Sequence, residues 1–454
     1  MLALTVLTVL IACSGAPTGL GFQSENPNGV LIEDVLYVSP TSVWLSPGDS
    51  VRLSVSLSIP GESSAGVTYA WATSDPSVAV VSKDGVVTGV GMGSATIGVE
   101  ANVPGKSVGE YRRQKATLVT VTTEEQEIAI SRIFGIPPST TQTSPTLSSF
   151  AGDYESIFQR YGDSHWGKSA GSWEHTYYDR GLAWYAAWWR TGNSLYIERG
   201  HKDILAYRDE YVLVHDGHVP PRWVFPEGLA VHYLLTGDSR SLEAIAKMAD
   251  RMVEVGWHTT MTDPDFEYVD GRAQGRAVLA LLIADILEAP GSRDWRSELD
   301  KGIQALIDWY AASGQDGSWT MAAYCGGQAH FQVSHAVLEA LIRYHDLVNP
   351  RNEIPPIVGN SLNYMWNHRW YPEERAFSYL DTECSGTDSL NPATDLNLLI
   401  VWPFGWYYRV SGDESFRSRG DEIYASGLES TWFDGYKQFN QSFMRSYRYL
   451  SYRQ

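Results

Sequence analysis

The chain has 454 residues, which favours two or three domains over a single compact core. Its formal net charge of −19 argues against nucleic-acid binding, because phosphate contacts need a basic face and the sequence has no Lys/Arg run. Aromatic residues make up 12 % of the chain and charged residues only 19 %, which excludes a disordered or coiled-coil protein and favours a globular one.

The first twelve residues carry no charge and are rich in Leu, Val and Ile. This stretch is too short for a membrane span but typical of a secretory signal. Leu10-Ile11-Ala12-Cys13 resembles the bacterial lipobox, although the usual basic residues before it are missing. The resemblance implies a signal peptide over 1–13, lipidation of Cys13, and export to the outer surface or periplasm of a bacterium, with the lipid as the only membrane contact. An ordinary signal with an incidental cysteine is the alternative.

Residues 33–122 alternate short β-rich runs with Gly, Pro and Asp turns, a spacing that predicts a small all-β sandwich. Within this stretch, four segments carry a resemblance to the bacterial Ig-like group 2 family: Val38–Ser42, Pro47–Asp49, Trp71–Val78 and Gly85–Gly93. The module offers core and turn residues but no cluster of reactive groups. We therefore expect it to act as a spacer.

Residues 123–150 contain Pro137-Pro138 and a Thr-Ser-Pro-Thr run, a composition that predicts an extended linker ending near Phe150.

From 151 to 454 the hydrophobic period changes from two to nearly four, which predicts helices. An apolar helix, a Gly/Pro turn and an amphipathic helix recur in five places: Arg180–Gly192, Glu227–Asp238, Arg276–Gly291, Ser334–Pro350 and Asp395–Asp413. A sixth hairpin would combine the two ends of this region, Tyr154–Tyr161 and Phe443–Tyr452, and would close the array.

A closed ring of helical hairpins resembles the (α/α)6 toroid of six-hairpin glycosidases and of several polysaccharide lyases; an open solenoid is the alternative. The expected fold is thus multidomain, an all-β Ig-like sandwich followed by an all-α (α/α)6 toroid. In the toroid families the cleft is lined by the loops that lead into the inner helices. Here those loops combine carboxylates with aromatic residues, as a sugar-binding cleft requires.

Hydrolysis of a glycosidic bond needs one carboxylic acid and one carboxylate. The leading pair is Glu227 with Asp270, and Asp179 and Asp388 are substitutes. Three of these acids, Asp179, Glu227 and Asp270, fall at or near predicted helix starts, where capping explains a single acid equally well.

Ten further residues are expected to bind substrate: Trp173, Arg180, Arg222, Trp223, Tyr268, Arg272, Trp319, Tyr324, His330 and His335. Elimination from a uronate polymer would instead use Arg272, His330, His335 and Tyr324 from this set. A partly buried helix position is the alternative for His335, and core packing is expected for Trp184, Trp188 and Trp189.

The sequence therefore predicts a secreted or surface-anchored enzyme that degrades a polysaccharide or oligosaccharide. Hydrolysis is placed ahead of β-elimination, and a non-catalytic glycan-binding or adhesive protein is the competing class. No cofactor or metal is expected, because the common phosphate-loop, metalloprotease and esterase motifs are missing. Cys325 and Cys384 are a possible disulfide pair, with two free buried thiols as the alternative.

Overall fold

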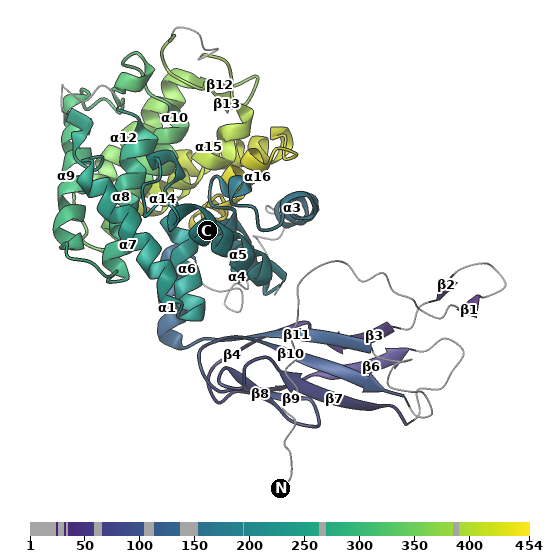
Figure 1. Ribbon diagram of the computed structural model, residues 1–454. Helices are drawn as coiled ribbons and strands as arrows, with labels where there is room; N and C mark the ends of the chain where they lie inside the picture. Colours follow the sequence, from purple (N-terminus) through teal and green to yellow (C-terminus); the bar gives the residue numbers. More distant parts are fainter. Residues whose placement is uncertain are drawn as a thin grey trace.

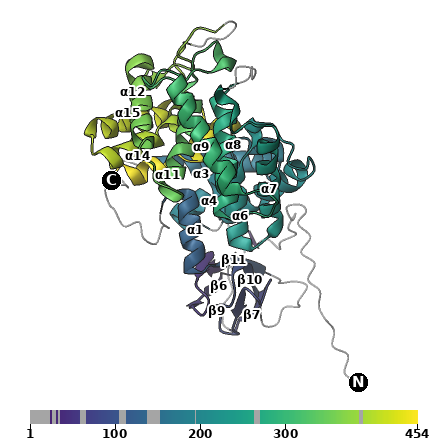
Figure 2. The same cartoon turned by 90° about the vertical axis from the view of Figure 1, so that its left-hand side faces the viewer.

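The computed structural model describes residues 24–25, 31–32, 35–58, 66–103, 113–136, 153–193, 195–262, 269–384 and 390–454. Cys13, Tyr268 and Asp388 lie outside these residues. Figure 1 shows an N-terminal β module, a larger helical body, and helix α1 between them, and Figure 2 shows the same order after a quarter turn.

The β module contains a sheet of order β4-β11-β10-β7, a three-stranded sheet β5-β9-β8 and the pair β3-β6. Gly85 has φ +75°, and a Cβ there would lie 2.8 Å from the Trp71 ring, so only glycine fits this turn. A separate short pair, β1-β2, precedes them. The strands are β1 (Ser24–Glu25), β2 (Leu31–Ile32), β3 (Val35–Ser39), β4 (Ser42–Leu45), β5 (Ser50–Arg52), β6 (Ser54–Ser58), β7 (Thr68–Thr73), β8 (Ala79–Val81), β9 (Val86–Gly89), β10 (Gly93–Asn102) and β11 (Arg113–Val121).

The first part of the predicted linker differs from expectation, because residues Glu124–Phe134 form helix α1. Thr123 and Gln126 cap its start reciprocally, and Gly135 ends it in the left-handed conformation. The helix buries Ile130, Ile133 and Phe134 in the core of the helical body. The prediction of an extended spacer from residue 123 is therefore corrected: the apolar face of this segment belongs to the second domain.

The β module also touches the helical body directly. The ring of Trp44, on β4, lies 5.1 Å from the rings of both Trp188 and Trp189. Gln126 of α1 donates a hydrogen bond of 2.7 Å to the carbonyl of Leu234. These contacts give the module a packed interface, which a free spacer would not need.

The helical body is a ring of hairpins in which inner and outer helices alternate (Figures 1 and 2). The inner helices are α4 (Arg180–Thr191), α6 (Pro226–Thr236), α8 (Gly271–Ile286), α10 (His330–Gln332) with α11 (Glu339–Leu347), α13 (Asn397–Ile400) with α14 (Trp402–Ser411), and α16 (Tyr436–Phe443) with α17 (Tyr447–Tyr452). The outer helices are α3 (Tyr154–Ser169), α5 (Leu195–Ala206), α7 (Ser239–Glu254), α9 (Trp295–Ala312), α12 (Ile354–Arg369) and α15 (Glu414–Ser430).

The ring closes through its two ends, as the sequence predicts. Helix α16 packs against both α3 and α4. The hydroxyl groups of Tyr154 and Ser446 lie 2.9 Å apart across this seam. The inner helices are nearly all buried, and Trp184, Trp188 and Trp189 are core residues as expected.

Among the described residues, no helix is both long enough and apolar enough to span a bilayer.

Candidate functional site

Each inner helix starts from a loop that follows an outer helix, so these loops gather at one end of the ring, here called the rim. The described rim segments are 170–179, 213–225, 255–262, 269–270, 313–329, 370–384, 390–396 and 431–435. The strands β12 (Trp370–Tyr371) and β13 (Ala376–Phe377) belong to the rim and lie at the end of the body remote from the β module (Figure 1). The opposite end, next to α1, is here called the floor.

Aromatic side chains gather at the rim. The Trp173 ring stacks on Tyr211 at 4.3 Å, and Trp223 lies 4.7 Å from Tyr177. Within the described part of the helical body, the exposed Trp, Tyr and Phe side chains are three: Tyr379 (37 %), Tyr436 (38 %) and Trp432 (58 %). All three lie in the rim loops or in the first turn of α16. Exposed aromatic rings confined to one end of a domain indicate a binding surface.

Arg272, in the first turn of α8, is the polar centre of the rim. Its Nη1 donates to the Tyr177 hydroxyl at 3.2 Å, and its Nη2 lies 3.4 Å from Oδ2 of Asp270. Its backbone N–H donates to Gln332, whose amide in turn donates to the Tyr324 hydroxyl. The guanidinium therefore contacts Tyr177 and Asp270, and the backbone of Arg272 connects to Tyr324 through Gln332.

Tyr379 interacts electrostatically with Arg272 and with two carboxylates. Burial raises the pKa of Tyr379, the charge of Arg272 opposes this rise, and Asp270 and Asp395 add to it. Asp270 caps α8 and accepts hydrogen bonds from the backbone N–H groups of Arg272 and Ala273 at 2.8 and 3.2 Å. Asp395 is half-exposed and accepts a long hydrogen bond of 3.4 Å from Gln438.

Asp179 lies deeper and links two inner helices through hydrogen bonds. Its oxygens accept the backbone N–H groups of Leu182 on α4 and Gly228 on α6, each at 3.0 Å. Burial raises the pKa of Asp179 to about 6 against the effect of these two hydrogen bonds. Both Asp179 and Asp270 therefore act as helix caps, which is the alternative that the sequence left open.

Glu227, the leading acid of the sequence analysis, does not face the rim. Its side chain is 1 % exposed and forms ion pairs with Arg343, Arg445 and Arg448. Glu339 shares all three partners, with Oε1 lying 2.9 Å from Arg445, 2.7 Å from Arg448 and 3.8 Å from Arg343. These five residues form the floor cluster. The prediction that Glu227 is an available general acid is corrected, because three guanidinium groups enclose it.

Three predicted substrate-binding residues are also core residues. Arg180 is fully buried and holds Asp203 with two hydrogen bonds of 2.6 and 2.8 Å. Trp319 is 1 % exposed and donates from its indole to Ser361, while His330 is fully buried between Gln328 and Ser378. Their expected role in contacting substrate is corrected.

The other predicted binding residues keep their place near the rim. Trp173, Trp223, Arg272 and Tyr324 are half-buried there, and Arg222 is exposed. His335 is 1 % exposed and lies in a π-helical segment, Val333–Leu338. This agrees with the alternative of a buried helix position. Burial lowers the pKa of His335 well below its ordinary value, so the imidazole is neutral.

Buried polar atoms without a hydrogen-bond partner line the ring just below the rim. Among the described residues they include Nε of Arg272, Nη2 of Arg276, Nε2 of His335, Oδ1 of Asn440 and Oε1 of Gln441. Buried polar groups in folded proteins nearly always have a partner, and water or a ligand serves where the chain supplies none. This arrangement suits a polar ligand that enters from the rim.

A disulfide links two rim loops. Cys325 and Cys384 are bonded, with their Cα atoms 5.7 Å apart. The bond holds the loop that carries Tyr324 against the loop that follows Tyr379.

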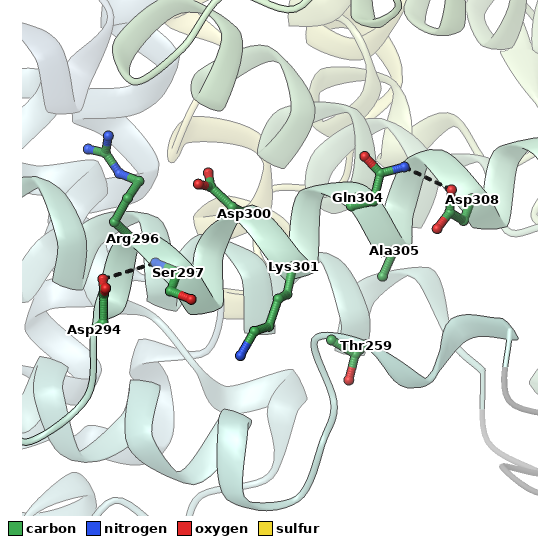
Figure 3. Close-up of a pocket in the computed structure, with 9 residues that line it drawn as sticks. All are labelled: Thr259, Asp294, Arg296, Ser297, Asp300, Lys301, Gln304, Ala305 and Asp308. Atoms are coloured by element: carbon green, nitrogen blue, oxygen red, sulfur yellow. Dashed lines mark hydrogen bonds between the residues drawn. The ribbon is translucent and has the colours of Figure 1, made fainter.

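A separate shallow groove of about 710 Å³ lies on the outer helix α9 and is bordered by Thr259 of one rim loop (Figure 3). Its lining consists of Ala305 and polar or charged side chains, and Asp300 is hydrogen-bonded to Tyr344 at 2.7 Å. It has none of the aromatic faces found at the rim. Among the described residues no group of three or more His, Cys, Asp or Glu side chains is placed to hold a metal ion.

Comparisons with known proteins agree with this architecture. Residues 35–110 match the bacterial Ig-like domain (group 2) family. The N-terminal module is a bacterial Ig-like domain. No curated protein matches the chain in sequence.

The helical body resembles solved structures at low identity. An unsaturated glucuronyl hydrolase specific for heparin has a TM-score of 0.50 at 8 % identity, covering 67 % of this chain and 97 % of its own. An unsaturated glucuronyl hydrolase from Streptococcus agalactiae scores 0.46 at 12 % identity, covering 61 % and 81 %. The GH76A α-1,6-mannanase from Salegentibacter sp. HEL1_6 scores 0.47 at 10 % identity, covering 65 % and 99 %. At such identities the likeness concerns the fold alone, the (α/α)6 toroid.

The sequence analysis missed Asp395, Tyr379, Trp432 and Tyr436 as individual site residues. Asp395 opens the fifth predicted hairpin, and Tyr379 lies in the loop before it. Trp432 lies in a short loop and Tyr436 opens α16, and neither stands next to a predicted catalytic carboxylate.

Proposed function

We propose that the toroid is a carbohydrate-active enzyme that hydrolyses glycosidic bonds in a polysaccharide or oligosaccharide lying across the rim. The observation that carries the proposal is that the exposed aromatic side chains of the described part of the body lie at the same end of the ring as Arg272, Asp270 and Asp395. Flat aromatic faces bind sugar rings, and two carboxylates supply the acid and the base of hydrolysis.

Asp395 replaces Glu227 in the proposed catalytic pair. It is half-exposed and lightly hydrogen-bonded, so a bound sugar can cover it, and it would donate a proton to the leaving oxygen. Asp270 is buried beside Arg272 and also caps α8, and in this proposal it is the carboxylate that accepts a proton from water. Arg272 would hold a polar or acidic substituent of the sugar with its remaining N–H groups.

The unsaturated glucuronyl hydrolases that share the fold are named for an acidic sugar, which is consistent with an arginine at the centre of this rim. This supports the inclusion of uronate-bearing glycans among the candidate substrates.

β-Elimination is the second candidate, and the hydroxyl groups beside Arg272 favour it. Tyr177 and Tyr324 lie within one hydrogen bond of Arg272 or of its partner Gln332, so a tyrosine and a carboxylate-binding guanidinium are adjacent, as elimination from a uronate requires.

The test is an assay of the purified protein on mannan, xylan, polygalacturonate and hyaluronan. Hydrolysis produces reducing ends without ultraviolet absorbance, whereas elimination produces a conjugated, ultraviolet-absorbing double bond together with each new end. Reducing ends alone support the proposal. Both signals rising together would establish the second candidate, and retention of a glycan without any product would establish a binding protein.

We also propose that the protein is exported and carries a lipid on Cys13, on the strength of the lipobox-like segment. The full chain expressed in a bacterium should fractionate with membranes and incorporate radiolabelled palmitate, and Cys13→Ser should abolish both. Equal labelling of the variant would contradict the proposal.

A further inference from the structure

The loop between α15 and α16 presents the most exposed aromatic side chain in the described part of the helical body. Trp432 is 58 % exposed, whereas its neighbours Thr431 and Phe433 are 8 % and 3 % exposed. Phe433 packs on Tyr161 and Phe443 at ring distances of 5.4 Å. Because both neighbours are buried, the packing of this loop keeps the Trp432 side chain exposed to solvent.

The backbone of this loop is fixed as well. Nε2 of the buried His165 donates to the carbonyl of Phe433 at 2.7 Å. Burial lowers the pKa of His165, so the ring is neutral and this nitrogen carries its proton. A Cβ at Gly435 would lie 2.7 Å from the Trp432 ring, which shows that the ring rests closely on the glycine. The indole is therefore a preorganised platform.

This platform continues into the rim site. Tyr436, 38 % exposed, stands edge-on to His175 at 4.8 Å in the first rim loop. Two residues after Tyr436, Gln438 donates to Asp395, the proposed acid. The exposed rings thus extend from Tyr379, beside Asp395, across the start of α16 to Trp432.

The charges around Trp432 limit what can bind there. Asp434, two residues after Trp432, is exposed, as is Glu174, which precedes the His175 that contacts Tyr436; Lys437 is half-buried, and the chain as a whole carries a charge of −19. Carboxylates accept hydrogen bonds from sugar hydroxyl groups but repel an acidic group. The Trp432 side of the rim therefore suits an uncharged sugar ring.

We infer that Trp432 and Tyr436 form an outlying subsite for an uncharged sugar residue of a long glycan, so that the enzyme acts on chains rather than on their terminal disaccharides. The inference rests on the proposed function but concerns chain length. Stacking on an aromatic platform adds affinity only when the ligand is long enough to reach it from Asp395.

The test compares wild type, Trp432→Ala and Trp432→Phe on mannan, xylan, polygalacturonate and hyaluronan, each as polymer, hexasaccharide and disaccharide. Dissociation constants are measured by affinity electrophoresis and calorimetry, and KM is measured for any glycan that is cleaved. Tyr37→Ala is the matched control, because Tyr37 is an aromatic residue 57 % exposed in the Ig-like domain.

Trp432→Ala should weaken polymer and hexasaccharide binding about tenfold and leave disaccharide binding and kcat unchanged, whereas Trp432→Phe should restore most of the loss. Tyr37→Ala should change nothing. Equal affinities of wild type and Trp432→Ala for every chain length would overturn the inference, even if the enzyme hydrolyses glycans. Trp432-dependent binding without any product would support the subsite and refute the proposed hydrolysis. Wild type that binds no glycan would overturn both.

Discussion

The rim and the floor of the ring contain similar charged residue types, but these residues differ in exposure and in the number of their charged partners. At the rim, Arg272 is partly exposed, Asp395 is half-exposed, and Asp270 is buried beside Arg272, while buried polar atoms just below lack partners. At the floor, two glutamates and three arginines are buried against one another, and Arg448 caps helix α1 through the carbonyls of Phe134 and Ile133 at 2.8 and 2.9 Å. Acids at both ends fall near helix starts, so the number of charged partners distinguishes the two sites: three guanidinium groups surround Glu227, and one lies beside Asp270.

The largest effect should come from breaking the floor cluster. Glu227→Gln leaves three guanidinium groups with one carboxylate, Glu339, in a site that excludes water. Removing one partner of a buried ion pair costs about 3–5 kcal/mol, so we expect a similar loss in the free energy of unfolding, measured by urea denaturation at pH 7. Glu174→Gln, at an exposed rim position, is the control and should be unchanged. A Glu227→Gln variant of wild-type stability would contradict the structural role of the cluster.

The next largest effect on the free energy of unfolding is expected at Asp179, and it depends on pH. Its pKa is about 6 in the folded state and near 3.8 when the side chain is exposed, so the folded protein binds more protons than the unfolded chain between these values. The contribution of Asp179 to stability therefore falls by about 3 kcal/mol in total, at 1.36 kcal/mol per pKa unit, as pH rises from about 3 to about 7.

The check is the difference in unfolding free energy between wild type and Asp179→Asn at pH 4 and pH 7. The subtraction removes the opposite contribution of buried histidines such as His201 and His232, whose pKa values burial lowers. The difference should change by about 2 kcal/mol in favour of the variant between pH 4 and pH 7. No change with pH would show that Asp179 has an ordinary pKa.

A smaller effect is expected at the contact between the Ig-like domain and the toroid. Trp44→Ala removes a half-buried indole from the Trp188 and Trp189 rings and should lower the unfolding free energy by about 2 kcal/mol. For the same reason a chain that starts near Phe150, without α1, should be destabilised and lose activity. A stable, fully active shortened chain would restore the interpretation of the domain as a spacer.

Much of the architecture was predictable because it depends on local chemistry. The turn glycines Gly192, Gly237 and Gly412 end inner helices, and the two terminal segments close the ring. Helix α1 was missed although its capping box, Thr123 with Gln126, is visible in the sequence, because the prolines that follow dominated the interpretation of the segment.

The site was less predictable because it depends on contacts between distant residues. Glu227 pairs with arginines 116, 218 and 221 residues away, and nothing near it in the sequence distinguishes it from an accessible acid. Asp395 and Tyr379 come together with Asp270 only when the ring closes.

The most direct test of the account measures turnover and stability together in Asp395→Asn, on a glycan that the wild type cleaves. We expect turnover to fall by about a hundredfold or more, as loss of a general acid implies, with the unfolding free energy within about 0.5 kcal/mol of wild type. Near-normal turnover in a stable Asp395→Asn protein would contradict the assignment of the chemistry to the rim.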